Sequence, residues 1–143
     1  MEIRNPAYRE RAAEIFTRAN FVVDLGIEPV SIGPGAVESR LAVLERHLQQ
    51  DGVIHAGVQT TLADHTAGAA AFTVIGPEQM VLTTGFTINL LATARGEELR
   101  ARAQVLRAGG RLIVSESCVF AVEGGRESLV SKATVTLAVL PNR

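Results

Sequence analysis

Apolar and polar residues alternate along most of the second half of the chain, which is the pattern of β-strands with one buried face. The alternation predicts four strands, at Met80–Thr93, Leu99–Leu106, Leu112–Val122 and Leu129–Leu140. Glycine pairs at Gly109-Gly110 and Gly124-Gly125 mark tight turns, and such turns pair consecutive strands antiparallel. A further hairpin is predicted over residues 27–44, with its turn at Gly33-Pro34-Gly35.

Before this hairpin, the chain has the spacing of an amphipathic helix. Asn5 suits the N-cap position, Pro6 suits the first helical position, and Gly26 is predicted to end the helical segment. The apolar stripe of this helix comprises Tyr8, Ala12, Ile15, Phe16 and Ala19. We expect the stripe to pack on the sheet.

The longest segment with helical spacing lies between the hairpin and the later strands. It runs from about Ala56 to Val74, which corresponds to ~28 Å of helix. The segment is rich in small residues, namely Ala63, Ala67, Gly68, Ala69, Ala70 and Ala71. Because Gly within a helix costs ~1 kcal/mol relative to Ala, we expect another backbone to lie very close to this helix.

This helix contains one acidic residue, Asp64. Asp64 shares a helical face with Gly57, Thr61 and Gly68, because the four residues recur at spacings of three and four. We expect the chemistry of the protein to take place on this face.

The predicted order is therefore one helix, two strands, one long helix and four strands. A single helix of small residues can be buried if a sheet curls around it. The sequence thus predicts an α+β protein, in which a curved antiparallel sheet wraps around one long central helix and an N-terminal helix lies outside. The 143 residues are expected to form a single domain, 1–143.

Composition narrows the classes of partner and site. The formal net charge is −1 and no basic cluster is present, so nucleic acid is not expected as a partner. The apolar runs are too short to span a bilayer, and no membrane association is expected. Cys118 is the only cysteine, and the three histidines lack metal-ligand spacing, so we expect no metal and no cofactor. A reducing cytoplasm is the expected location.

The segment QQDGVIHAGVQTTLAD resembles the signature of hotdog-fold acyl-CoA thioesterases of the phenylacetyl-CoA (PaaI-like) type. That signature places Asn or Gln before a Gly, then His-Gly-Gly, then an acid nine residues after the His. Here Gln49, Gly52, His55 and Asp64 match, and Ala56-Gly57 occupies the two glycine positions. The resemblance covers nearly the whole chain, and it implies the hotdog fold and hydrolysis of an acyl- or aryl-CoA thioester to the acid and free CoA.

Thioester hydrolysis requires groups that stabilise the oxyanion formed at the carbonyl. Backbone N–H groups at a helix start are unpaired and lie at the positive end of the helix dipole, so we expect Ala56 and Gly57 to supply them. The resemblance implies that Asp64 either attacks the carbonyl or activates water, and the sequence leaves both routes open. The resemblance also assigns Gln49 to the thioester or the water.

Further candidate substrate contacts follow from the approximate register of the predicted strand at Met80–Thr93 relative to the long helix. Thr83 or Thr84 would lie beside the acid, and Gly68 follows Asp64 on the same helix face, so these three are candidate substrate contacts. His55 has two interpretations, as a structural residue that fixes the loop before the helix or as a base. The alternative interpretation of Asp64, Gln49 and both threonines is that they are ordinary helix, loop and strand residues.

The chain departs from the family pattern at two points. Ala56 stands where the family often has Gly. Alanine still supplies a backbone N–H, but its Cβ narrows the path by which the substrate carbonyl approaches. Leu90–Thr93 replaces a turn that often contains proline, which affects the shape of the coenzyme channel.

Two other functions remain open on the same fold. A hydratase or dehydratase would, by resemblance, need a catalytic histidine such as His55 paired with an acid. A non-catalytic acyl-CoA-binding module would not need Asp64 at all.

The family's domains pair side by side, and pairing protects the open edge of a sheet. We therefore expect a homodimer, or a homotetramer built as a dimer of dimers. Asp64 lies about two turns from Ala56, ~12 Å along the helix axis, so one thioester carbonyl cannot contact both residues of the same straight helix. We expect each active site to combine Ala56 of one subunit with Asp64 of the other.

Overall fold

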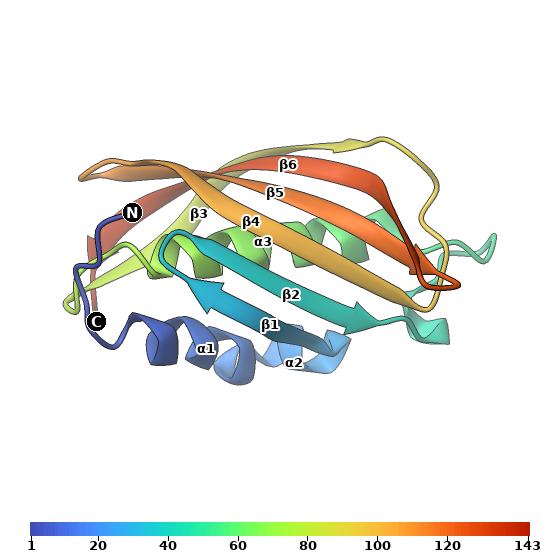
Figure 1. The fold of residues 1–143 in the computed structure, drawn as a ribbon, viewed down its shortest axis with the longest axis horizontal. Coiled ribbons are helices and arrows are strands. Elements are labelled where there is room, and N and C mark those ends of the chain that lie inside the picture. The colour runs from blue at the N-terminus through green and yellow to red at the C-terminus, as the bar shows by residue number, and fades with distance from the viewer.

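The computed structural model describes residues 1–143, in which a six-stranded antiparallel sheet curls around one central helix (Figure 1). The helices are α1 (Tyr8–Arg18), α2 (Asn20–Leu25) and α3 (Ala56–Phe72), with a short 3₁₀ turn at Glu45–His47. The strands are β1 (Ile27–Gly33), β2 (Ala36–Ala42), β3 (Gln79–Leu90), β4 (Glu98–Ala108), β5 (Leu112–Glu123) and β6 (Arg126–Pro141). The predicted α+β architecture and the predicted order of elements are confirmed.

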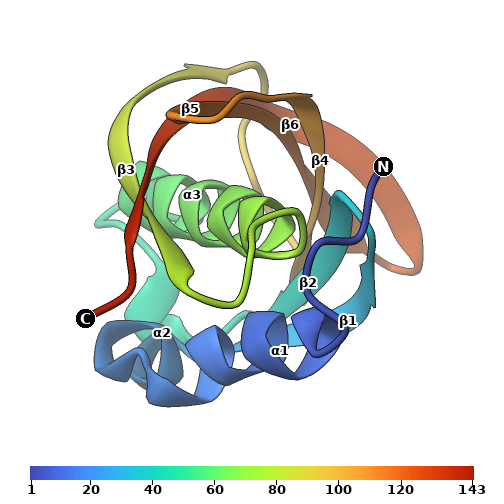
Figure 2. The ribbon, with the colours of Figure 1, turned by 90° about the vertical axis from the view of Figure 1, so that its left-hand side faces the viewer.

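The strands lie in the order β1-β2-β4-β5-β6-β3, so β1 and β3 are the two edges of the sheet. Because side chains alternate along a strand, each strand presents one row to α3 and one row to the outside. In β4, Leu99, Ala101 and Ala103 point inward and are buried, whereas Arg100 and Arg102 point outward. Figure 2 shows the sheet arching over α3, with α1 and α2 on the opposite side of the helix.

The small residues of α3 allow the helix to lie close against the concave face of the sheet. Leu62 and the alanines on this side are at most 1 % exposed, and α3 contacts every strand. The close approach of another backbone expected at Gly68 is not found, because an added Cβ there would meet only the Leu137 side chain, at 3.9 Å. The helix ends at Phe72 rather than Val74, because the Thr73 and Val74 N–H groups already bond in a tighter turn to Ala70 and Ala71.

The N-terminal helical segment differs from the prediction in two details. It begins at Tyr8 rather than Pro6, because the Asn5 side chain accepts a backbone N–H two residues later and closes a turn first. It is also interrupted at Ala19, where ψ is 99°, so that α1 and α2 are separate helices. Gly26 ends α2 with a φ of 89°, as predicted.

Strand β3 ends at Leu90, three residues before the predicted end at Thr93. The Leu91 and Ala92 N–H groups both donate to the Val130 carbonyl, at 2.8 and 3.2 Å, which turns the chain out of the ladder. The residues after this turn leave the sheet and approach the start of α3. None of the helices is both long and apolar enough to cross a membrane.

Candidate active site

Helix α3 begins at Ala56 and is capped by the side chain of the preceding residue. His55 Nδ1 accepts the Gly57 N–H at 2.8 Å. A Cβ added at Gly57 would lie 3.0 Å from His55 Nδ1, so the His55 ring would have to shift to admit a side chain here. The expectation that both Ala56 and Gly57 offer free N–H groups is therefore wrong for Gly57, whose N–H is taken by the cap.

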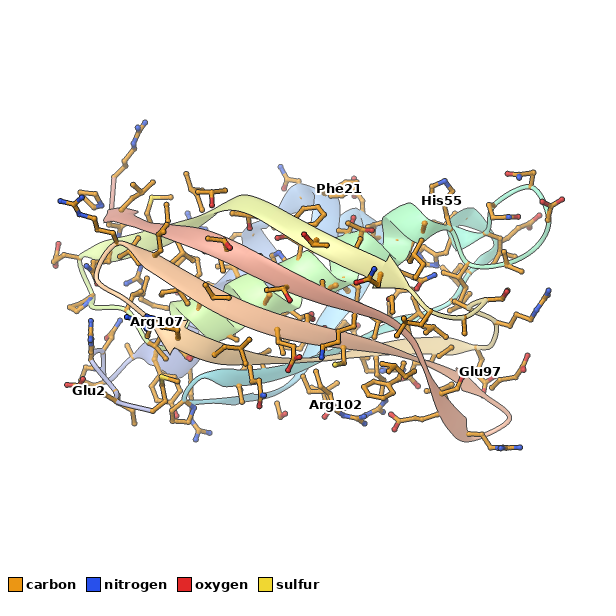
Figure 3. The ribbon with its side chains drawn as sticks, turned by 90° about the horizontal axis from the view of Figure 1, so that it is seen from above. Glu2, Phe21, His55, Glu97, Arg102 and Arg107 are labelled. Carbon is orange, nitrogen blue, oxygen red and sulfur yellow. The ribbon has the colours of Figure 1, made fainter.

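The Ala56 N–H has no hydrogen-bond partner within the chain. It lies at the positive end of α3, and Ala56 is exposed. Figure 3 shows the neighbouring His55 at this end of α3, outside the sheet. A carbonyl oxygen that gains negative charge could therefore accept a hydrogen bond from Ala56.

A cavity of about 600 Å³ opens beside this helix start. It is formed by the loop before α3, by the first turn of α3, and by residues 90–94, which follow β3. Three of the candidate site residues, Gln49, His55 and Ala56, line it. The Gln49 side-chain oxygen accepts the Asp51 N–H, which holds the loop in a tight turn. The departure at Leu90–Thr93 thus shapes the wall of the cavity.

Two backbone hydrogen bonds fix the chain at the entry to α3. The Ile54 N–H donates to Ala94, and the His55 N–H donates to His47, at 3.0 and 2.9 Å. His47 is itself completely buried. The motif did not single out this histidine, and nothing in its spacing distinguishes it.

The His47 ring ties two segments together. Its Nδ1 accepts the Leu44 N–H at 2.8 Å, so the ring proton is on Nε2, which donates to the Leu25 carbonyl at 2.8 Å. The ring thereby connects the end of α2 to the loop that leads into the site. His47 positions the site without lining the cavity.

Asp64 is half-buried on the partly exposed face of α3 that it shares with Thr61 and Gly68. The Thr83 hydroxyl donates to Asp64 Oδ1 at 2.8 Å. Burial raises the pKa of Asp64 above its ordinary value, and the hydrogen bond from Thr83 lowers it in part. Thr84 does not reach the acid, because its hydroxyl donates to the Thr136 carbonyl instead.

The predicted site residues thus form two groups on one chain. Gln49, His55 and Ala56 surround the cavity, whereas Asp64 and Thr83 lie outside it, farther along α3. Gly57, Thr61, Asp64 and Gly68 are each at least partly exposed, as a common helix face predicts, although the rest of α3 is largely buried. A single chain does not place the acid beside the free N–H.

Two further polar side chains near the site lie outside the motif. Gln59 is only 4 % exposed, lines the cavity, and its Oε1 has no hydrogen-bond partner. His65 follows Asp64 and packs against Phe16 of α1, with the ring centres 4.8 Å apart. Burial lowers the pKa of His65 to about 4, so its ring is neutral at neutral pH. Helical spacing places Gln59 one turn after Ala56, which is the one signal that could have indicated it.

Comparison with known proteins decides the family. Residues 51–128 match the family described as the thioesterase superfamily, which is more than half of the chain. The chain belongs to this superfamily. Its predicted hotdog fold is confirmed, and it is a thioester hydrolase by family.

Individual relatives agree with this assignment. The chain is 30 % identical over 119 residues to a 1,4-dihydroxy-2-naphthoyl-CoA hydrolase of Listeria monocytogenes, which covers 83 % of the chain and 94 % of the relative. A thioesterase family protein from Silicibacter pomeroyi superposes with a TM-score of 0.92 at 32 % identity, over 94 % of this chain and 99 % of that one. A conserved protein from Pseudomonas aeruginosa superposes with a TM-score of 0.77 at 33 % identity, over 85 % and 94 % of the two chains. Acyl-CoA thioester hydrolysis by a hotdog thioesterase is the activity that these matches support.

Proposed function

We propose that this protein hydrolyses an acyl- or aryl-CoA thioester of the phenylacetyl-CoA (PaaI-like) type to the free acid and CoA. The observation that carries the proposal is the unpaired Ala56 N–H, which lies at the positive end of α3 beside a cavity of about 600 Å³. Cavities of this size accommodate small organic groups. The relative from Listeria is named for an aromatic CoA thioester, which favours an aryl group.

In this mechanism the thioester carbonyl oxygen accepts a hydrogen bond from the Ala56 N–H. Asp64 supplies the attack in one of two ways. As a nucleophile, its carboxylate forms a mixed anhydride, which water then hydrolyses; as a general base, it takes a proton from the attacking water. In both routes the C–S bond breaks and CoA leaves as a thiolate, which takes up a proton. The raised pKa of Asp64 makes it a stronger base than an exposed aspartate.

Gln49 and His55 have supporting roles in this proposal. Gln49 lines the cavity and would hold the thioester or the attacking water in place. The Nδ1 atom of His55 is occupied by the Gly57 N–H, so the ring serves as the helix cap rather than as a general base. This arrangement disfavours a hydratase, which would need that histidine for proton transfer.

We further propose that the protein is a homodimer, or a dimer of such dimers, with β3 at the subunit interface. Strand β3 has only one neighbour in the sheet, and its inward-facing Phe86 and Leu90 are 46 % and 52 % exposed. Such an edge offers unpaired backbone groups and apolar side chains to a second copy. Phe21 of α2, also exposed, lies on the same side of the molecule as β3 (Figure 3).

A dimer through β3 would also bring the two groups of site residues together. Asp64 bonds to Thr83 of β3, so it lies beside the proposed interface. The acid of one subunit would then face the Ala56 N–H of its partner. Each dimer would contain two such shared sites.

The test is the release of free thiol from a panel of CoA esters, measured for the wild-type protein and for Asp64→Asn. Hydrolysis predicts thiol release by the wild-type protein that the substitution abolishes. Tight binding of CoA esters without thiol release would instead identify a binding module. Hydration of an enoyl-CoA without thiol release would identify a hydratase.

A further inference from the structure

The position of the Ala56 N–H depends on the residue before it in the chain. This N–H belongs to the planar peptide unit that joins His55 to Ala56, so any shift of the His55 backbone moves it. The Ala56 N–H has no partner in the chain that would hold it directly. The His55 N–H, in contrast, donates to the His47 carbonyl at 2.9 Å. The backbone of His47 therefore holds the peptide unit on which the proposed hydrolysis depends.

The His47 side chain in turn fixes its own backbone between two parts of the chain. The residue is completely buried and lies in the 3₁₀ turn at Glu45–His47. Its Nδ1 accepts the Leu44 N–H at 2.8 Å, which closes that turn. Its Nε2 donates at 2.8 Å to the carbonyl of Leu25, the last residue of α2, 22 positions earlier. His47 thus joins the end of α2 to the residue that precedes Ala56.

Both ring nitrogens are needed for this connection. A backbone N–H can only donate and a carbonyl oxygen can only accept, so Nδ1 is unprotonated while Nε2 carries the proton. An aliphatic side chain of similar size would remove the partner of the Leu44 N–H and the donor to the Leu25 carbonyl at once. His47 does not line the cavity, so it can influence a bound thioester only through the backbone that it holds.

We propose that His47 is a positioning residue for the hydrolysis, whose ring holds the His55–Ala56 peptide unit with its N–H directed at the thioester carbonyl. This inference rests on the proposed role of the Ala56 N–H. A hydrogen bond to the carbonyl strengthens as the oxygen gains negative charge, so a misplaced N–H weakens the transition state more than the bound substrate. Loss of the His47 ring should therefore lower kcat more than it raises KM.

The first experiment compares His47→Leu and His47→Gln in thiol release, with the CoA ester that the wild-type protein hydrolyses fastest. His47→Leu should lower kcat by ~10-fold or more and change KM by less than ~3-fold, since small displacements of a positioned group cost this much. His47→Gln should restore most of kcat, because a carboxamide of similar length supplies both an acceptor and a donor.

His47→Asn is a milder variant, for use if His47→Leu does not fold. Its side chain keeps an acceptor for the Leu44 N–H but is too short to reach the Leu25 carbonyl. Because the connection to α2 is then lost, His47→Asn should also lower kcat more than it raises KM.

Thr73→Val is the matched control for the loss of a buried polar anchor. Thr73 is also completely buried, and its hydroxyl accepts the Gly35 N–H at 2.7 Å and donates to the Ala70 carbonyl at 2.6 Å. It follows the last residue of α3, at the opposite end of the helix from Ala56. Thr73→Val should therefore lower the midpoint of urea unfolding and leave kcat unchanged.

A second measurement does not depend on catalysis. Hydrogen exchange of the His55 amide reports directly on its bond to the His47 carbonyl. In His47→Leu this amide should exchange at least ~10-fold faster, relative to the amides of the β4–β5 ladder, and His47→Gln should restore most of the protection. Thr73→Val should leave this ratio unchanged.

The proposal is overturned if His47→Leu keeps the wild-type kcat, or if Thr73→Val lowers kcat as much for an equal loss of stability. It is also overturned if His47→Gln turns over no faster than His47→Leu. A wild-type protein that releases no thiol from any ester would refute the proposed hydrolysis. Unchanged exchange of the His55 amide in His47→Leu would instead refute the positioning by His47 and leave the hydrolysis standing.

Discussion

The Thr83 hydroxyl donates a hydrogen bond of 2.8 Å to Asp64 Oδ1, which connects the edge strand β3 to the partly exposed face of α3. The two residues are 19 positions apart in the sequence. Burial raises the pKa of the carboxyl group, and this one hydrogen bond favours its charged form. Thr83 therefore offsets part of the effect of burial on the pKa of Asp64 and holds one oxygen of its carboxyl group.

Thr83→Val should move the acid limb of the kcat/KM profile to higher pH. Hydrolysis needs the ionised carboxylate, so activity is lost as pH falls through the pKa of Asp64, and removing the hydrogen bond raises that pKa further. Thr84→Val is the matched control, because the Thr84 hydroxyl bonds to a backbone carbonyl and not to the acid. An identical acid limb in wild-type protein and Thr83→Val would contradict this role.

Asp64→Asn should lower kcat by at least ~10²-fold, because it removes the base or nucleophile but keeps the size of the side chain. The fold should be retained, as judged by circular dichroism. Asp24→Asn, an equivalent change at an exposed residue of α2, should leave the rate unchanged. Near-normal turnover by the purified Asp64→Asn protein would show that Asp64 is an ordinary helix residue without a catalytic role.

His55→Ala should destabilise the protein by ~1 kcal/mol, because the Gly57 N–H loses its cap. His55→Asn should restore most of this stability, since Asn is a good N-cap. Urea unfolding measures both changes. We expect activity to fall less in His55→Ala than in Asp64→Asn, and the opposite order would favour an acid–base role for the histidine.

Two inactive variants should restore activity when they are mixed, if sites are shared between subunits. Asp64→Ala removes the acid, and Ala56→Pro removes the free N–H at a position where a helix tolerates proline. A mixed dimer then has one site with both defects and one with neither, so co-refolding should recover up to about a quarter of wild-type activity for random pairing.

Each of these variants must first be shown to fold and to dimerise by itself. Sedimentation then establishes the oligomeric state of the wild-type protein. A stable, active monomer at micromolar concentration would refute the proposed dimer. Mixed dimers that form but remain inactive would refute the shared site alone.

Stability should fall as pH drops from about 6.5 toward 4, because of His65. Its pKa is about 4 in the folded chain and 6.5 when unperturbed, so in this range the unfolded chain binds the proton more readily. His65 therefore makes its full contribution to the free energy of unfolding above pH 6.5. This contribution, on the order of 1–3 kcal/mol, is lost at lower pH. His65→Leu should flatten the dependence of urea unfolding on pH between 7 and 4.5, and an unchanged slope would exclude His65 as its source.

Much of the fold could be predicted because its signals are local. Strict alternation in residues such as Leu99, Ala101 and Ala103 identifies a strand with one buried face, and the structure buries all three. The ends of elements were less predictable. The break at Ala19 and the early end of β3 at Leu90 depend on hydrogen bonds to partners distant in the chain or on local turns without a sequence signal.

The candidate site could be predicted only where the spacing of residues along the sequence determines their positions. The motif selected Gln49, His55 and Ala56, which line one cavity in the structure, and approximate register selected Thr83 or Thr84, of which Thr83 contacts the acid. It did not show that the Gly57 N–H is occupied, since that depends on the rotamer of the His55 ring. It also gave no sign of the part played by His47, whose partners lie on other segments.

The sequence by itself determined the α+β architecture, the start of α3 at Ala56, and the face of α3 that carries Asp64, because periodicity and spacing along one element decide each of these. Tertiary structure alone decided that Thr83 rather than Thr84 meets the acid. Two adjacent strand residues point to opposite faces, and a β-bulge between Thr83 and Gly85 shifts the register of β3. Tertiary structure also decided that the oxygen of Gln59 is buried without a partner, because burial is a property of the elements that close around a side chain.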